Sequence, residues 1–381
     1  MQKTKIGIIG GGQLGKMMTL EAKKMGFYVI VLDPTENCPS HSISDEHIIA
    51  KFDDMGAINE LAKKSDVVTY EFEHIGSKAL IDLENNGHKI YPTAKSLKVI
   101  QDKLTQKEAL SAGKAPVGEF MCVESIDNII KAGEEYGYPF LLKARTGGYD
   151  GKGNYLVKNK DDINTAYEAL GSGKLPLMAE KYVDFLIEIS VLACRNAAGE
   201  TVIYPVVQNH HEDNVLIETK VPADISRETE SLAMKAAEQV MDIFKGVGMF
   251  CTEMFVLKDG GILINEVAPR PHNSGHYSIE GSVTSQFENH IRAICALPLG
   301  DTNLIRPTVM RNILGADIVS NGMAVVDGMD DALRILGVKV HVYGKEFSKV
   351  QRKMGHLTVT AETLEQAAER AEKAHSLIKI Y

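Results

Sequence analysis

The chain has 381 residues, 44% hydrophobic and 24% charged, which predicts two or three domains of ordinary globular composition. Its net charge of −9 argues against the basic surface that nucleic-acid binding needs. Five scattered cysteines without metal-ligand spacing indicate a reducing compartment, with neither a disulfide framework nor a zinc site. Only a short apolar run precedes the first glycines, so we expect no signal peptide, no membrane span and a cytoplasmic location.

The first part of the chain alternates apolar runs with helical patterns, as a parallel sheet with crossover helices does. The run Lys5–Ile9 leads into the glycine-rich segment 10–15, a helix from about residue 16, and a second run, Tyr28–Leu32, that ends at Asp33. This is the G-x-G-x-x-G arrangement of dinucleotide-binding units, in which backbone N–H groups can hold a phosphate. A tight turn that only needs small residues is the alternative. We predict a doubly wound, Rossmann-like α/β domain over residues 1–100.

Two acids, Glu71 and Glu73, follow the next predicted strand at residues 66–70. Open α/β sheets keep their ligands at the carboxyl ends of their strands, so both acids are candidates for a binding site. An acid in this place is also often only a helix cap. A polar helix predicted over residues 101–112 then connects to a second domain.

A glycine-rich loop follows Lys143, which ends a buried apolar run. Residues 144–153 contain four glycines and Lys152 between two predicted strands. Such a loop can fold over a polyphosphate while backbone N–H groups and lysines supply positive charge, whereas a chance glycine turn is the simpler alternative. Glu180 and Glu188 are placed to accept hydrogen bonds from amine and ribose hydroxyl groups, or to remain solvated strand-end charges.

Two strand-like runs flank Asp259-Gly260, a pair typical of a two-residue hairpin turn. Counting outward from that turn places Glu253 opposite Glu266. Like charges opposite each other among apolar neighbours are destabilising, and a divalent cation between them removes that penalty. Hard oxygen ligands predict magnesium or manganese. The alternatives are a one-residue bulge that separates the two carboxylates, or neutralisation by Lys258 and Arg270.

The remaining segments carry weaker signals. His210 and His211 are expected in a turn between strands, where a histidine pair is more often solvated than functional. Residues 299–381 predict a small C-terminal domain of strands closed by a helix. Its basic cluster at 348–356 is either a surface patch or a clamp for phosphate or carboxylate.

Taken together, the order of these features resembles the ATP-grasp superfamily, and more closely the 5-(carboxyamino)imidazole ribonucleotide synthase family of purine biosynthesis. The resemblance covers essentially the whole chain and rests on four segments in order, which are residues 10–15, 147–153, 268–276 and 352–356. It implies an α/β and α+β multidomain protein. An ATP-grasp domain over 101–298, with a mobile lid at about 115–183, would follow the Rossmann-like domain and precede the C-terminal domain.

The resemblance also implies a reaction. Bicarbonate attacks the γ phosphorus of ATP to give carboxyphosphate, whose breakdown delivers carbon dioxide to the amine of aminoimidazole ribonucleotide. Magnesium would be held by Glu253 and Glu266, and the family suggests a homodimer. Two positions depart from the pattern of relatives: Ala268, where a third metal ligand is often an asparagine, and Lys103, where an arginine is frequent.

Site residues follow from the same resemblance. The implied catalytic residues are Glu73, Tyr149, Arg270, His272 and Lys353. The implied ATP-binding residues are Lys103, Lys143, Gly148, Tyr149, Asp150, Gly151, Lys152, Gly153, Asn154, Glu180, Lys181, Tyr182, Val183, Glu188, His211, Asn265 and Glu266. The implied binding residues for the ribonucleotide are Gly12, Gln13, Leu14, Glu73, Tyr149, Lys152, His272, Asn273, Ser274, Arg352 and Lys353.

Two other classes of function are open. A nicotinamide-dependent dehydrogenase built on the first domain is supported by Gly10, Gly12, Gly15 and Asp33. It leaves the second glycine loop and the paired glutamates unexplained. A nucleotide-binding regulator without catalysis is the other, although a pure sensor has no need of a complete set of metal and phosphate groups.

Overall fold

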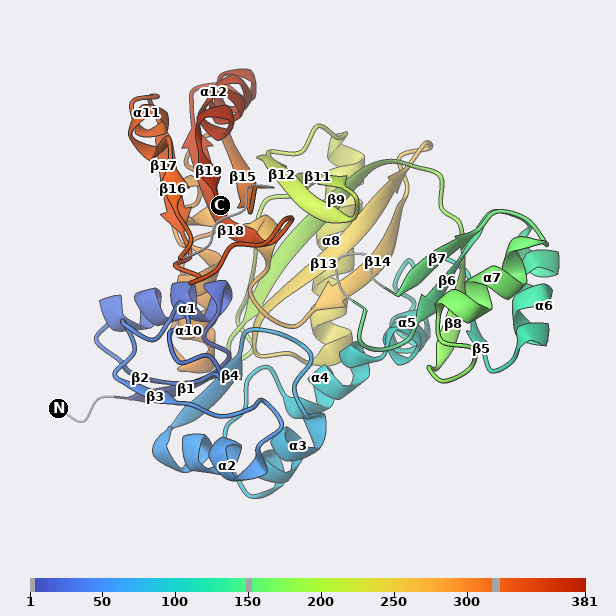
Figure 1. The fold of residues 1–381 in the computed structure, drawn as a ribbon, viewed down its shortest axis with the longest axis horizontal. Coiled ribbons are helices and arrows are strands. Elements are labelled where there is room, and N and C mark those ends of the chain that lie inside the picture. Colours follow the sequence, from blue (N-terminus) through green and yellow to red (C-terminus); the bar gives the residue numbers. More distant parts are fainter. Residues whose placement is uncertain (1–3, 149–152, 317–322) are drawn as a thin grey trace.

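The structure is a computed structural model that describes residues 4–148, 153–316 and 323–381 (Figure 1). Within these ranges the chain forms an N-terminal parallel sheet, a four-stranded antiparallel sheet, a nine-stranded central sheet and a short two-stranded sheet. We call the four-stranded antiparallel sheet and its helices the lid, after the segment for which a lid was predicted. None of the described helices is long and apolar enough to cross a membrane.

The N-terminal sheet is parallel, with strand order β3-β2-β1-β4. Its side chains alternate between two faces: Ile30 and Leu32 pack toward α2 and α3, whereas Val29 and Val31 pack toward α1 and α10. Both faces are therefore covered, which confirms the predicted doubly wound fold (Figure 1). The elements are β1 (Lys5–Ile9), α1 (Gln13–Lys24), β2 (Tyr28–Leu32), β3 (Glu46–Ile48), α2 (Met55–Lys64), β4 (Val67–Tyr70), α3 (Ser77–Asn85) and α4 (Ala94–Gln101).

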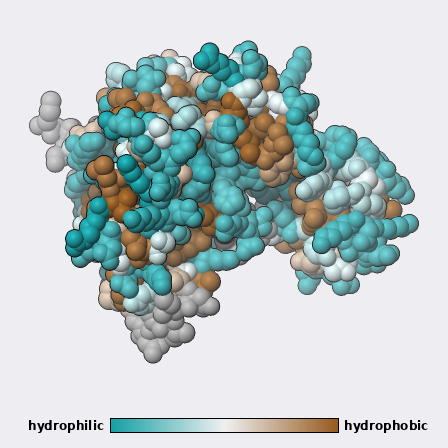
Figure 2. All heavy atoms as spheres, turned by 90° about the horizontal axis from the view of Figure 1, so that it is seen from above, coloured by the Kyte–Doolittle hydropathy of each residue, from teal (hydrophilic) through white to brown (hydrophobic). Residues whose placement is uncertain are grey.

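The lid is an antiparallel sheet of order β5-β8-β6-β7, with α6 and α7 packed on it. It has its own apolar core, which includes Ile129, Phe140 and Leu142. Figure 2 shows it as a lobe at the right, with the surface hollowed where it meets the rest of the molecule. Its elements are β5 (Phe120–Val123), α6 (Ile126–Tyr136), β6 (Phe140–Ala144), β7 (Asn154–Val157), α7 (Asp162–Ala169) and β8 (Leu177–Lys181).

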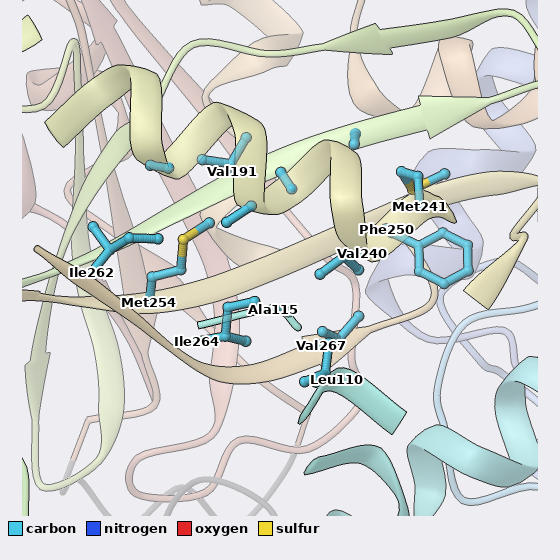
Figure 3. Packing of buried hydrophobic residues seen from close by; sticks show 14 of the residues in the cluster. Leu110, Ala115, Val191, Val240, Met241, Phe250, Met254, Ile262, Ile264 and Val267 are labelled. Carbon is cyan, nitrogen blue, oxygen red and sulfur yellow. The ribbon is translucent and has the colours of Figure 1, made fainter. Parts of the chain in front are cut away.

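The central sheet has the order β14-β13-β9-β11-β12-β15-β18-β17, with β10 paired to β9. Helix α8 covers one face, where Val240 and Met241 lie beside Phe250 (Figure 3). Since α5 also packs against β14, this edge strand lies between α5 and β13. The elements are α5 (Lys103–Ala112), β9 (Phe185–Arg195), β10 (Thr201–Ile203), β11 (Val207–Glu212), β12 (Val215–Val221), α8 (Arg227–Phe244), β13 (Gly248–Leu257), β14 (Ile262–Ala268), the 3₁₀ turn η1 (Asn273–Gly275), α9 (Ser278–Gly281) and α10 (Gln286–Ile294).

The C-terminal strands continue the central sheet, because β15 pairs with β12 on one side and β18 on the other. A small apolar core under α12 includes Val309, Leu357 and Ala371. The pairing brings the start of β18, and with it Lys353, to the central sheet. The elements are β15 (Thr308–Leu314), β16 (Val326–Asp327), α11 (Met329–Leu333), β17 (Val338–Val342), β18 (Lys353–Thr360), α12 (Leu364–Leu377) and β19 (Lys379–Ile380).

The β13–β14 hairpin differs from its prediction in the turn but not in the pairing. The loop has three residues, 258–260, with Gly260 at φ +85°, and Val256 pairs with Ile262. The prediction of a two-residue turn was therefore wrong. Further from the turn the register shifts, because Asn265 is an extra residue without a partner on β13, and Glu253 then pairs with Glu266 as expected.

Substitution of Gly15 tests the glycine-rich start of α1. A Cβ atom there would lie 2.2 Å from the carbonyl oxygen of Gly10, a backbone atom that cannot move aside. We expect Gly15→Ala to destabilise the protein by about 1–3 kcal/mol and to lower Tm in thermal unfolding. The matched control is Gly76→Ala, since no atom lies within 4 Å of its added Cβ. Equal Tm values for the two variants would contradict this packing.

Candidate active site

A cavity of about 810 Å³ lies where the N-terminal sheet, the lid and the central sheet meet. It collects most of the predicted site residues from distant parts of the chain. Those that line it are Gln13, Leu14, Glu73, Lys103, Lys143, Gly148, Asn154, Glu188, His211, Glu253, Asn265, Glu266, Arg270, His272, Asn273 and Lys353. Tyr149, Asp150, Gly151 and Lys152 lie outside the described residues.

The paired glutamates lie on one wall of this cavity. Lys103 Nζ is 2.6 Å from Glu266 Oε2, and His272 Nε2 is 3.3 Å from Glu253 Oε1. Lys258 pairs instead with Asp184, so the suggested neutralisation of the glutamates by Lys258 is wrong. The bulge at Asn265 does not separate the two glutamates. It shifts the register of β14 by one residue, so that Glu266 pairs with Glu253.

The two carboxylates differ in their tendency to hold a proton. Burial raises the pKa of Glu253, and the charge of Glu266 raises it further. The Lys103 ammonium lowers the pKa of Glu266. Burial, together with the nearby Arg270 and Lys353, holds the pKa of His272 well below its usual value, so this imidazole is neutral.

This donor set fits a magnesium ion that takes its remaining ligands from phosphate and water. The two facing carboxylates supply hard oxygen ligands, and a cation would relieve the cost of ionising Glu253. Among the described residues no cluster of three or more histidines, cysteines or acids is arranged to hold a metal. Magnesium is typically bound in this way, by one or two carboxylates and substrate phosphates.

Beside the lid, the cavity is lined by Lys143, whose Nζ is 2.9 Å from Glu180 Oε2. Glu180 is buried beneath the cavity, and Lys107 Nζ lies 3.8 Å from the same oxygen. In this structure Glu180 therefore accepts a hydrogen bond from Lys143, and it is not among the residues that line the cavity. The remainder of the predicted segment, Lys181, Tyr182 and Val183, also lies outside the cavity lining.

Glu188 and His211 form an ion pair that faces the cavity. Burial lowers the pKa of His211, but the Glu188 carboxylate outweighs this effect and raises it overall. The expectation of a turn was wrong for both histidines, because they lie within β11 at a register shift. His210 is exposed and pairs with Glu212, whereas the shift turns its neighbour toward the site.

The base of the second glycine loop is tied to α5. Arg145 donates to both carboxylate oxygens of Asp102, at 2.6–3.1 Å, and its carbonyl oxygen accepts from the N–H of Lys103. Gly148 lines the cavity, whereas Gly153 does not, and the Gly153 carbonyl oxygen instead accepts from the N–H of Ala144. No pattern in the sequence predicted the Arg145–Asp102 pair.

At the opposite end, Arg270 Nη2 is 2.7 Å from Glu73 Oε1. Lys353 and Asn273 also line this end, and the Asn273 amide exchanges hydrogen bonds of 2.7 and 3.0 Å with Asn312. Arg352 and Ser274, which were predicted to bind the ribonucleotide at this end, lie outside the lining. Arg352 is exposed and donates to the carbonyl oxygen of Phe347, and Ser274 is fully buried beneath His272.

The first glycine loop is occupied by the protein's own carboxylates. Glu71 accepts from the N–H groups of Gly12 and Gly15 at 2.7 and 2.6 Å, and Asp33 accepts from the N–H of Gly11 at 2.8 Å. The Gly12 amide is thus not open to a phosphate here, and Asp33 is not turned toward a ribose. Gln13 and Leu14, the first residues of α1, remain in the lining.

These features define a class: a glycine loop in a lid, a lysine on the strand before it and a carboxylate pair on the central sheet are the parts of an ATP-grasp protein. Residues 108–287 match the ATP-grasp domain family, 3–101 the ribonucleotide synthetase preATP-grasp domain, and 308–370 the phosphoribosylaminoimidazole carboxylase C-terminal domain. The chain is 41% identical to N5-carboxyaminoimidazole ribonucleotide synthase of Staphylococcus epidermidis, over 95% of this chain and 93% of that protein. It is 40% identical to that of Bacillus subtilis, over 93% and 90%.

Solved structures agree. The N5-carboxyaminoimidazole ribonucleotide synthetase of Thermotoga maritima superposes with a TM-score of 0.89 at 45% identity, over 99% of each chain. The Aspergillus clavatus enzyme, in complex with ADP and 5-aminoimidazole ribonucleotide, gives a TM-score of 0.91 at 36% identity over 98% of each chain. This chain belongs to the N5-carboxyaminoimidazole ribonucleotide synthase family.

The raised pKa of Glu253, to about 7, predicts a pH dependence of stability in metal-free protein. The folded state binds this proton more tightly than the unfolded chain, so its stabilising effect is complete below pH 4.5 and is lost as pH rises through about 7. We expect Tm of the wild type in EDTA to fall relative to Glu253→Gln between pH 5 and 8. A constant difference in Tm across this range would rule out the raised pKa.

Proposed function

We propose that this chain carboxylates 5-aminoimidazole ribonucleotide with ATP and bicarbonate, giving N5-carboxyaminoimidazole ribonucleotide, ADP and phosphate in purine biosynthesis. The proposal rests on one observation, namely the distribution of charged residues between two ends of a single cavity. Lys143 and the carboxylate pair Glu253 and Glu266 lie at the nucleotide end, and Arg270 and Lys353 supply cations at the other. The dehydrogenase alternative is not supported, since Asp33 is committed to Gly11.

At the nucleotide end, Lys103 and Lys143 neutralise phosphate charge, and Glu188 and His211 meet the ribose. Glu253 and Glu266 would hold magnesium, which neutralises charge on the β and γ phosphates when bound. Both lysines already face carboxylates across short distances, so nucleotide phosphates can share the charge of these lysines without bringing new cations into the site. Catalysis of phosphoryl transfer by positioning and charge requires no protein nucleophile.

At the other end, Arg270 and Lys353 bind bicarbonate and then carboxyphosphate. A bicarbonate oxygen forms a bond to the γ phosphorus as ADP leaves; the carboxyphosphate C–O bond then breaks to give carbon dioxide and phosphate. The substrate amine attacks the carbon and loses its proton to that phosphate. Glu73 holds the Arg270 guanidinium at 2.7 Å, which fixes its direction without a covalent role.

His272 acts as a hydrogen-bond donor in this scheme. Its Nδ1 lies 3.3 Å from the N–H of Ser274, which donates to it, so the ring proton resides on Nε2. Since Nε2 faces the cavity and Glu253, a neutral His272 can donate to a carboxylate oxygen of the intermediate.

We place the ribonucleotide phosphate near the open N–H groups of Gln13 and Leu14, since a helix N-terminus favours an anion. Asn273 and Lys353 would face its imidazole side. The five free cysteines suit a cytoplasmic enzyme, and the family resemblance suggests a homodimer.

The direct test is to incubate the protein with magnesium ATP, bicarbonate and 5-aminoimidazole ribonucleotide and to follow phosphate release. We expect release well above a control without the ribonucleotide, together with formation of the carboxylated ribonucleotide. No increase over that control would refute the proposed reaction. NADH binding in the same preparation would instead favour the dehydrogenase.

Glu266→Gln tests the metal assignment. Loss of one carboxylate from the pair should lower kcat by about 100-fold or more, because charge on the transferred phosphoryl group is no longer neutralised. Tm should change little, since Glu266 is 42% exposed to the cavity. The control, Glu362→Gln, alters an exposed acid in the C-terminal unit and should keep wild-type turnover. Wild-type activity in Glu266→Gln would remove the metal assignment.

A further inference from the structure

The edge strand β14 carries the carboxylate of Glu266. Within the described residues it pairs with a full strand on one side only, and its other edge has one isolated parallel bridge, from Ile264 to Val117. An edge strand leaves a row of backbone N–H and C=O groups without partners. Here those groups meet α5, the helix that the sequence presents only as a polar connection. Lys103, Gln106, Lys107 and Leu110 recur at helical spacing and so share one face of α5. Figure 3 shows Leu110 of this face beside Val267 of β14.

Gln106 replaces a missing strand partner at Val267. Its Oε1 accepts from the Val267 N–H at 2.9 Å, and its Nε2 donates to the Val267 carbonyl oxygen at 3.2 Å. This is the reciprocal pair that a residue of a neighbouring strand would make. The side chain is 4% exposed, and its Nε2 also donates to the carbonyl oxygen of Ile100, which fixes the orientation of the amide.

Lys107 adds a hydrogen bond at Ile264, the residue of β14 that also forms the isolated bridge to Val117. Its Nζ donates to the Ile264 carbonyl oxygen at 3.0 Å, while the Ile264 N–H donates to the carbonyl oxygen of Pro116. Lys107 is also 4% exposed, and burial lowers its pKa to about 8, an effect that Glu180 offsets in part. A buried lysine is costly, and Lys107 is not among the residues that line the cavity, so direct binding of a ligand does not explain it.

The two contacts lie on either side of the bulge at Asn265. In a regular strand the outward-facing backbone groups recur at every second residue, but here they occur at Ile264 and Val267, three residues apart. The interval is three because Asn265 is the extra residue. Gln106 and Lys107 therefore match the bulged form of β14 and not a regular one. Without the bulge, Glu266 would not lie opposite Glu253.

We propose that Gln106 and Lys107 are positioning residues of the magnesium nucleotide site, which hold the Asn265 bulge and thereby keep Glu266 opposite Glu253. Neither residue touches the phosphates; both act through the backbone of β14. The inference rests on the proposed function, because it assumes that the two glutamates bind magnesium with the nucleotide. Outer partners of a metal ligand commonly affect metal affinity by tenfold or more.

The test measures ADP affinity by calorimetry, once with magnesium and once in EDTA, and compares the gain that magnesium gives. We expect this gain to fall by about tenfold or more in Gln106→Met, with little change of affinity in EDTA. The matched control is Gln239→Met, which also removes a glutamine donor from a backbone carbonyl, that of Gly113, but away from the cavity. An unchanged gain in a folded Gln106→Met protein would overturn the proposal.

Lys107→Met is the second variant, because methionine fills the space of the lysine stem without a buried charge. It should reduce the gain in ADP affinity from magnesium in the same way. If Gln106→Met does not fold, the result for Lys107→Met tests the proposal alone, and an unchanged gain in that variant would overturn it. Failure of the proposed function is a separate outcome, namely a wild-type protein that gains ADP affinity from magnesium but releases no phosphate with the ribonucleotide. A wild-type protein without any magnesium gain would overturn the inference itself.

Discussion

The structure depends on one unfavourable pairing, that of Glu253 with Glu266 across the β13–β14 hairpin. Two carboxylates placed directly opposite each other repel, and burial among apolar strands increases the cost. Three features of the surroundings reduce this electrostatic cost. Helix α5 brings the Lys103 ammonium, the segment after β14 brings the His272 imidazole, and burial favours the protonated form of Glu253. Such a pairing destabilises the sheet but favours the binding of a divalent cation between the two carboxylates.

Cations that line the cavity are likewise balanced by nearby acids. Lys143 pairs with Glu180 and Arg270 pairs with Glu73, so an acid of the chain balances each of these two cations. A buried cation without a partner would be far more costly than these pairs. Because Glu180 lies outside the cavity lining while Lys143 is part of it, an anionic substrate can approach Lys143 from the cavity side and share its charge. Ion pairs within the protein thus hold these cations in positions where they can bind a polyanion.

Local patterns in the sequence predicted much of this architecture, and its failures have physical reasons. The parallel N-terminal sheet, the lid strands and the opposed glutamates follow from apolar runs and turn signals. The three-residue turn did not, because Asp-Gly suits two-residue and three-residue loops alike, and nothing in the sequence marks Asn265 as a bulge. Gln106 and Lys107 were missed because a polar helix does not reveal which polar side chains turn inward.

The first glycine loop shows why a motif needs its surroundings. Its spacing matches a dinucleotide fingerprint. However, Asp33 and Glu71 accept hydrogen bonds from the backbone N–H groups that would otherwise bind a pyrophosphate. Two carboxylates at a helix N-terminus satisfy the same dipole that attracts phosphate, so they exclude a second anion from Gly11, Gly12 and Gly15. Only the start of α1 still faces the cavity. A loop closed in this way can accommodate one phosphate at its rim, which suits a ribonucleotide better than a dinucleotide.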